Sequence, residues 1–230
     1  MPGVNIPGFS GGDRTSLDLP EPQENLVRGA IAAGTPVVVV LTSGSAIAAN
    51  YAASNAAGLL VAWYGGEESG TAIAETLAGA NNPAGRLPVT FYKSADQLPP
   101  FTDYSMKGRT YRYFKGESLY PFGFGLSYSQ FAYSGLSARR TSNGAEIRAQ
   151  VRNTSPLDGD EVVQLYVAGG PGTEAPIRSL RGFQRIHLRA GESRQVRFAL
   201  DAGELPESPV EVSVGGGQPM ETIPHVSGSL

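Results

Sequence analysis

The first half of the chain carries two short, mainly apolar runs, and each is followed by a helical pattern. Residues 35–41 and 58–63 are rich in Val, Leu and Ala, which predicts two strands buried on both faces of a sheet. Ala-rich or amphipathic patterns at 46–53 and 67–77 predict the helices that follow them. Strand, helix, strand and helix in this order predict a βαβ unit with a parallel sheet.

Two further elements flank this βαβ unit. A helix is expected at 20–33, with Asp18 as its cap, Pro20 as its first residue and Gly34 as its stop. It would act as a crossover helix from a strand that lies outside this chain. Residues 86–91 are predicted to form an edge strand, because Pro88 lacks a donor for a central position.

From about residue 129 the pattern changes to alternating strands separated by turns. Six strands are expected, at 131–137, 145–151, 161–168, 179–188, 193–200 and 210–214. Such spacing favours an immunoglobulin-like sandwich of about seven strands. We therefore expect an α/β domain with a parallel sheet over residues 1–125, a long loop at 92–120 within it, and an all-β sandwich over 126–230.

Composition excludes several classes of function. The 230 residues are 40% hydrophobic and 17% charged, and the formal charge of -3 argues against a nucleic-acid partner. The chain has no Cys and only two His, so neither a metal centre nor a cofactor is expected. No apolar run approaches 18 residues and no charged leader is present, so we expect no membrane partner and no signal peptide.

Five ordered motifs resemble those of glycoside hydrolase family 3. They are Gly-Asp-Arg-Thr-Ser-Leu at 12–17, Trp-Tyr-Gly-Gly-Glu-Glu-Ser-Gly at 63–70, Asn-Pro-Ala-Gly-Arg-Leu-Pro at 82–88, Gly-Arg-Thr-Tyr-Arg-Tyr at 108–113 and Tyr-Pro-Phe-Gly-Phe-Gly-Leu-Ser-Tyr at 120–128. The tail, with Glu-Val-Val-Gln-Leu-Tyr-Val at 161–167, resembles the fibronectin type III-like domain that ends many of these enzymes. The resemblance implies the C-terminal part of the family's α/β sandwich domain, followed by that all-β sandwich.

The resemblance implies a retaining β-glycosidase of the β-glucosidase or β-xylosidase type, whose partner in the complete enzyme is an oligosaccharide or an aryl β-glycoside. Complete family members are often periplasmic or secreted. The family's nucleophile is an Asp in an N-terminal barrel domain, and its acid/base is a Glu shortly before the motif at 12–17. Because residues 1–11 contain neither Glu nor Asp, we expect both carboxylates, and the barrel, to lie outside this chain. The alternative is a non-catalytic carbohydrate-binding or structural module.

Two acidic residues, Glu67 and Glu68, are the candidate substitutes for the missing carboxylates. Their position at the start of a predicted helix favours a structural role, because the helix dipole and free N–H groups attract acidic side chains there. Adjacent carboxylates on one helix also diverge, whereas a retaining mechanism needs two groups about 5–5.5 Å apart. We therefore expect no catalytic residue in this chain.

Four residues are candidates for substrate binding. Asp13 and Arg14 either pin their Gly-rich loop or line the rim of a sugar site. Trp63 follows a parallel strand, where ligand contacts gather, but it can equally pack under the next loop. Arg109, with Tyr111 and Arg112, either binds sugar hydroxyls or anchors the barrel.

The turn at 42–45 lacks the Gly-rich and Gly-Lys-Ser/Thr signatures of nucleotide sites, so nucleotide binding is disfavoured. Apolar strands that need cover on both faces lead us to expect self-association.

Overall fold

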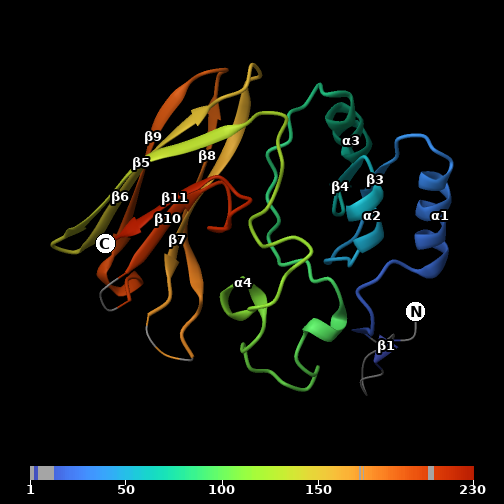
Figure 1. The fold of residues 1–230 in the computed structure, drawn as a ribbon, viewed down its shortest axis with the longest axis horizontal. Helices are drawn as coiled ribbons and strands as arrows, with labels where there is room; N and C mark the ends of the chain where they lie inside the picture. Colours follow the sequence, from blue (N-terminus) through green and yellow to red (C-terminus); the bar gives the residue numbers. More distant parts are fainter. Residues whose placement is uncertain (1–2, 5–12, 171, 173, 207–209) are drawn as a thin grey trace. The chain divides into compact units, whose positions relative to one another are not determined.

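The computed structural model describes residues 3–4, 13–170, 172, 174–206 and 210–230 (Figure 1). The chain forms two compact units. The first unit takes residues 1–74, 90–104 and 115–120, and the second takes 75–89, 105–114 and 121–230. Each unit is therefore assembled from segments that are separated in the sequence.

The first unit contains the parallel sheet that the apolar runs predict. Strand β3 (Val38–Leu41) pairs in parallel with β4 (Gly58–Val61), and Val38 lies opposite Gly58. The helices are α1 (Glu21–Ala32), α2 (Asn50–Asn55) and the start of α3 (Ser69–Ala78), with a short pair of strands, β1 (Gly3–Val4) and β2 (Asp13–Arg14), and a 3-10 turn, η1 (Ala95–Gln97). The strand and helix order confirms the α/β prediction.

The small core of this unit covers the sheet incompletely. Its buried residues are Val39, Leu41, Ile47, Ala49 and Ala52. Burial on both faces is a wrong prediction for the sheet as a whole, because every residue of β4 stays partly exposed and Val38 is 49% exposed. Helix α1 has no buried residue, and its Leu26 is 72% exposed. Two strands and short helices leave apolar surface in contact with water.

Helix starts differ from the sequence prediction for identifiable reasons. Helix α1 is preceded by Pro20, and no side chain caps it, so the predicted Asp18 cap is wrong: the carboxylate of Asp18 accepts a hydrogen bond from Ser16 Oγ instead (2.6 Å). Helix α2 begins at Asn50 instead of residue 46. The N–H of Ala48 donates to the carbonyl of Leu17 (2.8 Å), which takes this stretch out of a helical pattern.

The predicted edge strand at 86–91 does not form. Only Phe91 makes a strand-like bridge, to Tyr120. Pro88 has no N–H to donate, and the backbone N–H and carbonyl of Leu87 bond to Phe124 and Gly123 in a turn-like arrangement. The long loop that follows contains one helical turn that the sequence pattern did not predict, α4 (Thr110–Tyr113).

The second unit contains a sandwich of two antiparallel sheets. One sheet has the order β5 (Phe131–Thr141), β6 (Gly144–Asn153) and β9 (Ser193–Asp201). The other has the order β11 (His225–Ser229), β10 (Glu211–Gly215), β7 (Gly159–Ala168) and β8 (Arg178–Leu188), and a 3-10 turn, η2 (Ala202–Glu204), follows β9. All six predicted strands are confirmed, most with slightly extended ends (Figure 1).

The core of the sandwich comes from alternate residues of both sheets. Fully buried members include Ile147, Val151, Leu165, Leu188 and Val212. This alternation is what a two-layer β structure requires, since successive side chains point to opposite faces. It leaves the outer faces free to carry charged residues.

Candidate functional site

The carboxyl ends of β3 and β4 bring two turns together in the first unit. Gly44 lies in the turn after β3, and a Cβ atom there would lie 2.9 Å from Cε2 of Tyr64, in the turn after β4. A larger residue at position 44 would therefore displace the Tyr64 ring. Ligands of open α/β sheets bind outside the carboxyl ends of the strands, so this edge is the candidate site of the first unit.

Trp63 is placed at this edge in a strained backbone conformation. Its φ of 55° lies in the left-handed region, which costs a non-glycine residue about 1–3 kcal/mol. Its ring packs edge-on against Phe91, with centroids 6.0 Å apart, and Phe91 packs edge-on against Tyr120. Burial raises the pKa of Tyr120. These contacts favour the packing role for Trp63 over direct binding, although its proposed binding role stays a prediction.

Tyr64 is the site residue that the sequence reasoning did not single out. Its ring is 75% exposed and rests against Gly44, so one aromatic face is offered to solvent. An aromatic ring with a hydroxyl tip suits a ligand that has both apolar faces and polar edges. Its signal in the sequence is its place next to Trp63 and before two glycines, immediately after a buried strand.

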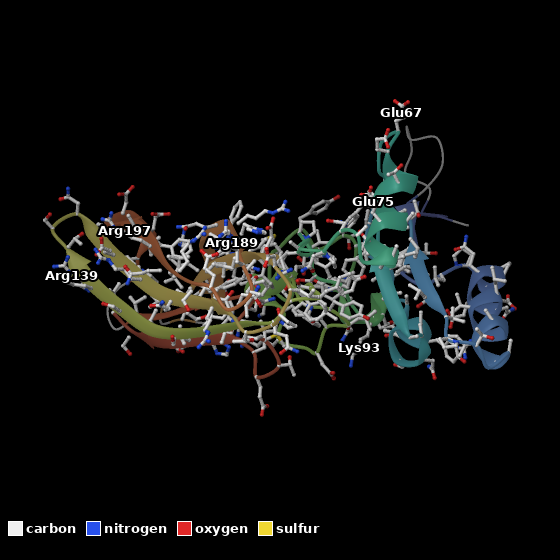
Figure 2. The ribbon with its side chains drawn as sticks, turned by 90° about the horizontal axis from the view of Figure 1, so that it is seen from above. Glu67, Glu75, Lys93, Arg139, Arg189 and Arg197 are labelled. Atoms are coloured by element: carbon white, nitrogen blue, oxygen red, sulfur yellow. The ribbon has the colours of Figure 1, made fainter. Side chains whose placement is uncertain are left out.

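Glu67 and Glu68 lie in a turn just before α3, which starts at Ser69. Both are exposed, and Figure 2 shows Glu67 pointing away from the ribbon at the tip of that turn. General acid catalysis needs a carboxyl group held within hydrogen-bond reach of the leaving oxygen, and a side chain that projects into solvent is not held in this way. A structural role for Glu67 and Glu68 before α3 is therefore better supported than a catalytic role.

The other candidate residues belong to other elements of the structure. The backbone of Asp13 and Arg14 forms β2, and their side chains lie outside the described residues. Arg109 belongs to the second unit, where its Nε donates to the carbonyl of Ser105 (3.1 Å).

The motif at 108–113 is anchored on the sandwich of the second unit. The ring of Tyr111 stacks on Phe122 with centroids 4.2 Å apart, and its hydroxyl accepts a hydrogen bond from the N–H of Leu180 (3.0 Å). Thr110 has a φ of 55°, an outlier for a β-branched residue. The motif therefore packs on strand β8, and its expected role in anchoring the barrel stays a prediction.

Arg112 of the same motif lines a cavity of about 270 Å³ beside the sandwich, together with Ser179 and Glu204. Its Nε is buried and has no hydrogen-bond partner among the described residues. Ordered water is the usual partner of such a donor in a polar cavity.

A buried ion pair joins the motif at 82–88 to the sandwich. Nη2 of Arg86 lies 2.7 Å from Oε1 of Glu161, and both side chains are almost fully buried. Burial raises the pKa of Glu161, and the charge of Arg86 opposes that rise only in part. Burial and then the nearby Glu161 raise the pKa of Tyr133 well above its ordinary value. The pair is structural, because Arg86 also donates to the carbonyls of Gly85 and Gly216.

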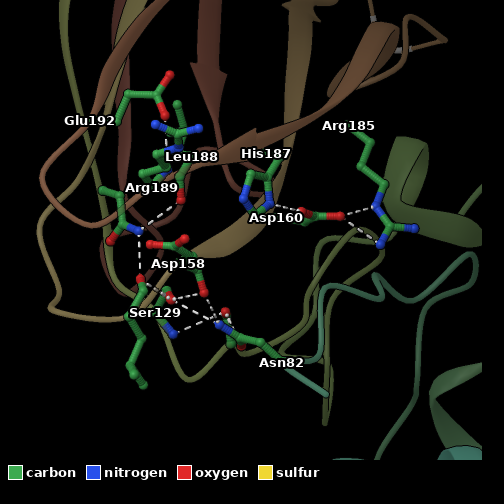
Figure 3. A network of polar contacts seen from close by, with 12 residues as sticks. Asn82, Ser129, Asp158, Asp160, Arg185, His187, Leu188, Arg189 and Glu192 are labelled. Carbon is green, nitrogen blue, oxygen red and sulfur yellow. Dashed lines mark hydrogen bonds and ion pairs between the residues drawn. The ribbon is translucent and has the colours of Figure 1, made fainter. Parts of the chain in front are cut away.

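A polar network fixes the same motif at a second point (Figure 3). Nδ2 of Asn82 donates to Ser129 Oγ and to the carbonyl of Asp158, each at 2.8 Å. Close by, Asp160 accepts from Arg185 and lies 2.7 Å from Nδ1 of His187. Burial raises the pKa of Asp160, but the bonds to His187 and Arg185 outweigh it and lower the pKa overall. These residues tie turns and strands together, and the carboxylate of Asp160 is engaged by Arg185 and His187.

Metal and membrane sites receive no support from the described residues. No group of three His, Cys, Asp or Glu side chains is placed to hold a metal ion in the described ranges. Within that same part of the chain, no helix combines the length and the apolar character needed to cross a bilayer.

Comparison with known proteins places the chain among carbohydrate-active proteins. The family described as "Glycosyl hydrolase family 3 C-terminal domain" matches residues 5–128, and the "Fibronectin type III-like domain" matches residues 161–206. A xylan 1,4-beta-xylosidase of Xylanibacter ruminicola is 45% identical over 88% of this chain and 24% of its own length. A periplasmic beta-glucosidase of Salmonella typhimurium is 35% identical over 84% of this chain and 27% of its own length.

Solved structures agree with these sequence matches. The structure of a beta-glucosidase of Bifidobacterium adolescentis superposes with a TM-score of 0.84 at 31% identity, over 96% of this chain and 37% of that protein. A beta-D-glucoside glucohydrolase of Trichoderma reesei gives a TM-score of 0.84 at 25% identity, over 99% of this chain and 38% of that protein. The chain spans about a quarter of the length of the curated relatives.

Proposed function

This chain belongs to the glycosyl hydrolase family 3 C-terminal domain family, and we propose that it forms the C-terminal part of a retaining β-glycosidase acting on β-xylosides or β-glucosides. The observation that carries the proposal is the 45% identity to a xylan 1,4-beta-xylosidase along 88% of this chain. The names of further relatives, a beta-xylosidase of Formosa agariphila among them, support the same substrate class.

In this proposal the chemistry is shared between this chain and a further domain. A retaining glycosidase needs a carboxylate nucleophile and a carboxylic acid about 5–5.5 Å apart on either side of the scissile bond. Among the described carboxylates, Glu161 is held by Arg86, and Glu67 and Glu68 are exposed neighbours. We assign both catalytic carboxylates to segments outside this chain. The contribution of this chain is the edge of the β3–β4 sheet, where Tyr64 would contact sugar.

A hydrolysis assay tests this assignment. The chain alone should not hydrolyse p-nitrophenyl β-xyloside or β-glucoside above the buffer rate, because positioning cannot replace an absent nucleophile and acid. Fused behind the N-terminal region of the Xylanibacter relative, it should restore hydrolysis. Tyr64→Ala in that fusion should lower kcat/KM about fivefold, since an aromatic contact contributes on the order of 1 kcal/mol.

Two outcomes of this assay would count against the proposal. Turnover by the chain alone that Glu67→Gln or Glu68→Gln abolishes would place catalysis within these 230 residues. A fusion that stays inactive, while a fusion with the relative's own C-terminal region is active, would contradict the proposed shared site.

The second candidate function is non-catalytic carbohydrate binding, which the exposed ring of Tyr64 favours. Trp63 is the only Trp of the chain and adjoins Tyr64, so its fluorescence reports on this edge. A fluorescence titration of the chain alone with xylobiose or cellobiose tests this candidate. A saturable change in Trp63 fluorescence that is lost in Tyr64→Ala would indicate binding by the chain alone.

A further inference from the structure

One outer face of the sandwich concentrates arginine. The inner face of the β5–β6–β9 sheet carries Ile147, Val196 and other core residues, so the alternate residues point outward. Four arginines lie at these outward positions: Arg139 on β5, Arg148 and Arg152 on β6, and Arg197 on β9. We call this set the arginine face. The acidic residues at outward positions of the same strands are Glu146 and Asp201, so the face is positive on a chain of net charge -3.

Two members of the arginine face would repel each other without an anion between them. Arg148 and Arg197 occupy directly opposite positions on neighbouring strands. Like charges in such pairs repel and destabilise a sheet, and neutral polar residues would serve the same exposed positions without that cost. Two facing arginines therefore need a shared anion to offset their repulsion.

Glu146 holds these arginines in place. Its carboxylate accepts a hydrogen bond from Nε of Arg197 and lies 2.9 Å from Nη2 of Arg148, and Arg139 lies 3.9 Å away. Burial raises the pKa of Glu146, but the bond to Arg197 and the charges of the three arginines outweigh it and lower the pKa. One carboxylate thus orders three guanidinium groups while neutralising only one charge.

Most donor capacity of the arginine face remains available. The side chains of Arg139, Arg148 and Arg197 are 74%, 45% and 65% exposed, whereas that of Glu146 is 11% exposed. Each guanidinium has five N–H donors, and the contacts to Glu146 use a minority of them. Arg152 makes no ion pair within the described part of the chain. Figure 2 shows Arg139 and Arg197 projecting from the sandwich.

We propose that the arginine face binds an acidic polysaccharide, one that carries uronate carboxylates along an extended chain. This proposal rests on the proposed function for its carbohydrate class. Charge complementarity favours a ligand that carries carboxylates, because a guanidinium pairs with a carboxylate through two parallel hydrogen bonds. The role of the face is to hold the protein on the charged polysaccharide, through residues other than Tyr64.

Nucleic acid fits the arginine face less well. Proteins that bind single strands stack bases on aromatic side chains, and the outward positions of β5, β6 and β9 carry none in the described structure. Nucleic acid is therefore a control in the test.

Binding of polygalacturonate to the full chain tests the proposal. Affinity electrophoresis and titration calorimetry should show binding at about 0.01 M salt that weakens at about 0.15 M, as the Debye length falls from about 30 Å to about 8 Å. Arg148→Gln combined with Arg197→Gln should weaken binding about tenfold, which is about 1.4 kcal/mol for the two exposed charge contacts together. Glu146→Gln should strengthen it, because the arginines lose their internal partner.

A matched control is Arg185→Gln combined with Arg189→Gln, which removes the same charge from β8 and the turn after it. This pair should leave the affinity unchanged, and circular dichroism should show both double variants folded. Absence of binding, equal binding by the two double variants, or tighter binding of duplex DNA than of polygalacturonate would overturn the proposal. Because this assay needs neither hydrolysis nor Tyr64, its failure is distinguishable from failure of the proposed function.

Discussion

At the scale of single residues, Arg86 and Glu161 form the contact with the largest energetic consequence. Replacing Arg86 with Met leaves a buried carboxylate without its cation, which should cost about 3–5 kcal/mol of unfolding free energy at pH 7. The cost should be smaller at pH 4. Burial raises the pKa of Glu161 above its ordinary value of 4.5, so at acid pH the carboxyl is neutral in both states and needs no partner.

Chemical denaturation at the two pH values measures this difference. The matched control is Arg185→Gln, which breaks the pair with Asp160. This pair is a suitable control because the side chain of Arg185 is 68% exposed. An exposed pair contributes about 0–1 kcal/mol. If Arg86→Met costs no more than Arg185→Gln, then water reaches the pair between Arg86 and Glu161 and the burial described above is wrong.

Single residues also mark where sequence reasoning reached its limit at the candidate site. The edge of the sheet was predictable, because apolar strands ending in Gly-rich turns place their carboxyl ends together. The separate roles of Trp63, which packs, and Tyr64, which is exposed, were not predictable. They depend on the left-handed φ of Trp63, which turns one ring toward Phe91 and leaves the next exposed, and no local pattern encodes that choice.

At the scale of elements, the sandwich strands carry their own core. The proposed domain boundary between residues 125 and 126 stays a prediction, and a shortened chain of residues 126–230 should melt cooperatively because every buried core residue of the sandwich lies within it. The melting temperature should nevertheless be lower than that of the same sandwich in the full chain. The shortened chain lacks Arg86, and it exposes Tyr166, which packs against Tyr111.

One substitution should have opposite effects in the two chains. Glu161→Gln should raise the melting temperature of residues 126–230, where the carboxylate is unpaired, and lower that of the full chain, where Arg86 would be left buried. Differential scanning calorimetry measures both. An unfolded shortened chain, or the same sign of change in both chains, would show that the strands depend on the other segments.

Elements with a clear period were the predictable part of the fold. Strand β9, and strand β6 from Ile147 on, alternate buried and exposed residues, and their positions follow directly from the sequence. Strand β11 was missed because His225–Ser229 holds one large apolar residue, Val226, and its pairing with β10 supplies what the pattern lacks. The predicted strand at 86–91 failed because Arg86 and Leu87 bond to distant residues, which a local pattern cannot reveal.

At the scale of the whole molecule, exposed apolar surface in the first unit predicts self-association. A parallel sheet normally has both faces covered, yet Val38 and Leu26 are 49% and 72% exposed. The chain at about 100 μM should scatter light as more than a monomer and bind a hydrophobic dye. Leu26→Lys should reduce both signals, because Lys keeps the helix propensity of that position.

The control for this prediction is Leu157→Lys. Leu157 is 52% exposed but belongs to the second unit, so its replacement should leave both signals unchanged. A strictly monomeric chain without dye binding would show that the exposed residues of the first unit are too scattered to form a contact surface.

The interleaving of the two units has a consequence for the chain during its synthesis. Segments 75–89 and 105–114 leave the ribosome early but belong to the unit completed by the sandwich strands. Arg86 emerges 75 residues before its partner Glu161, which is a delay of roughly 4–15 s at 5–20 residues per second. During that interval the early segments lack their partners on the later sandwich strands, such as Glu161 for Arg86, while the first unit can close once residue 120 has emerged. Slower translation between residues 120 and 161 should therefore lengthen exposure of these segments to chaperones and proteases.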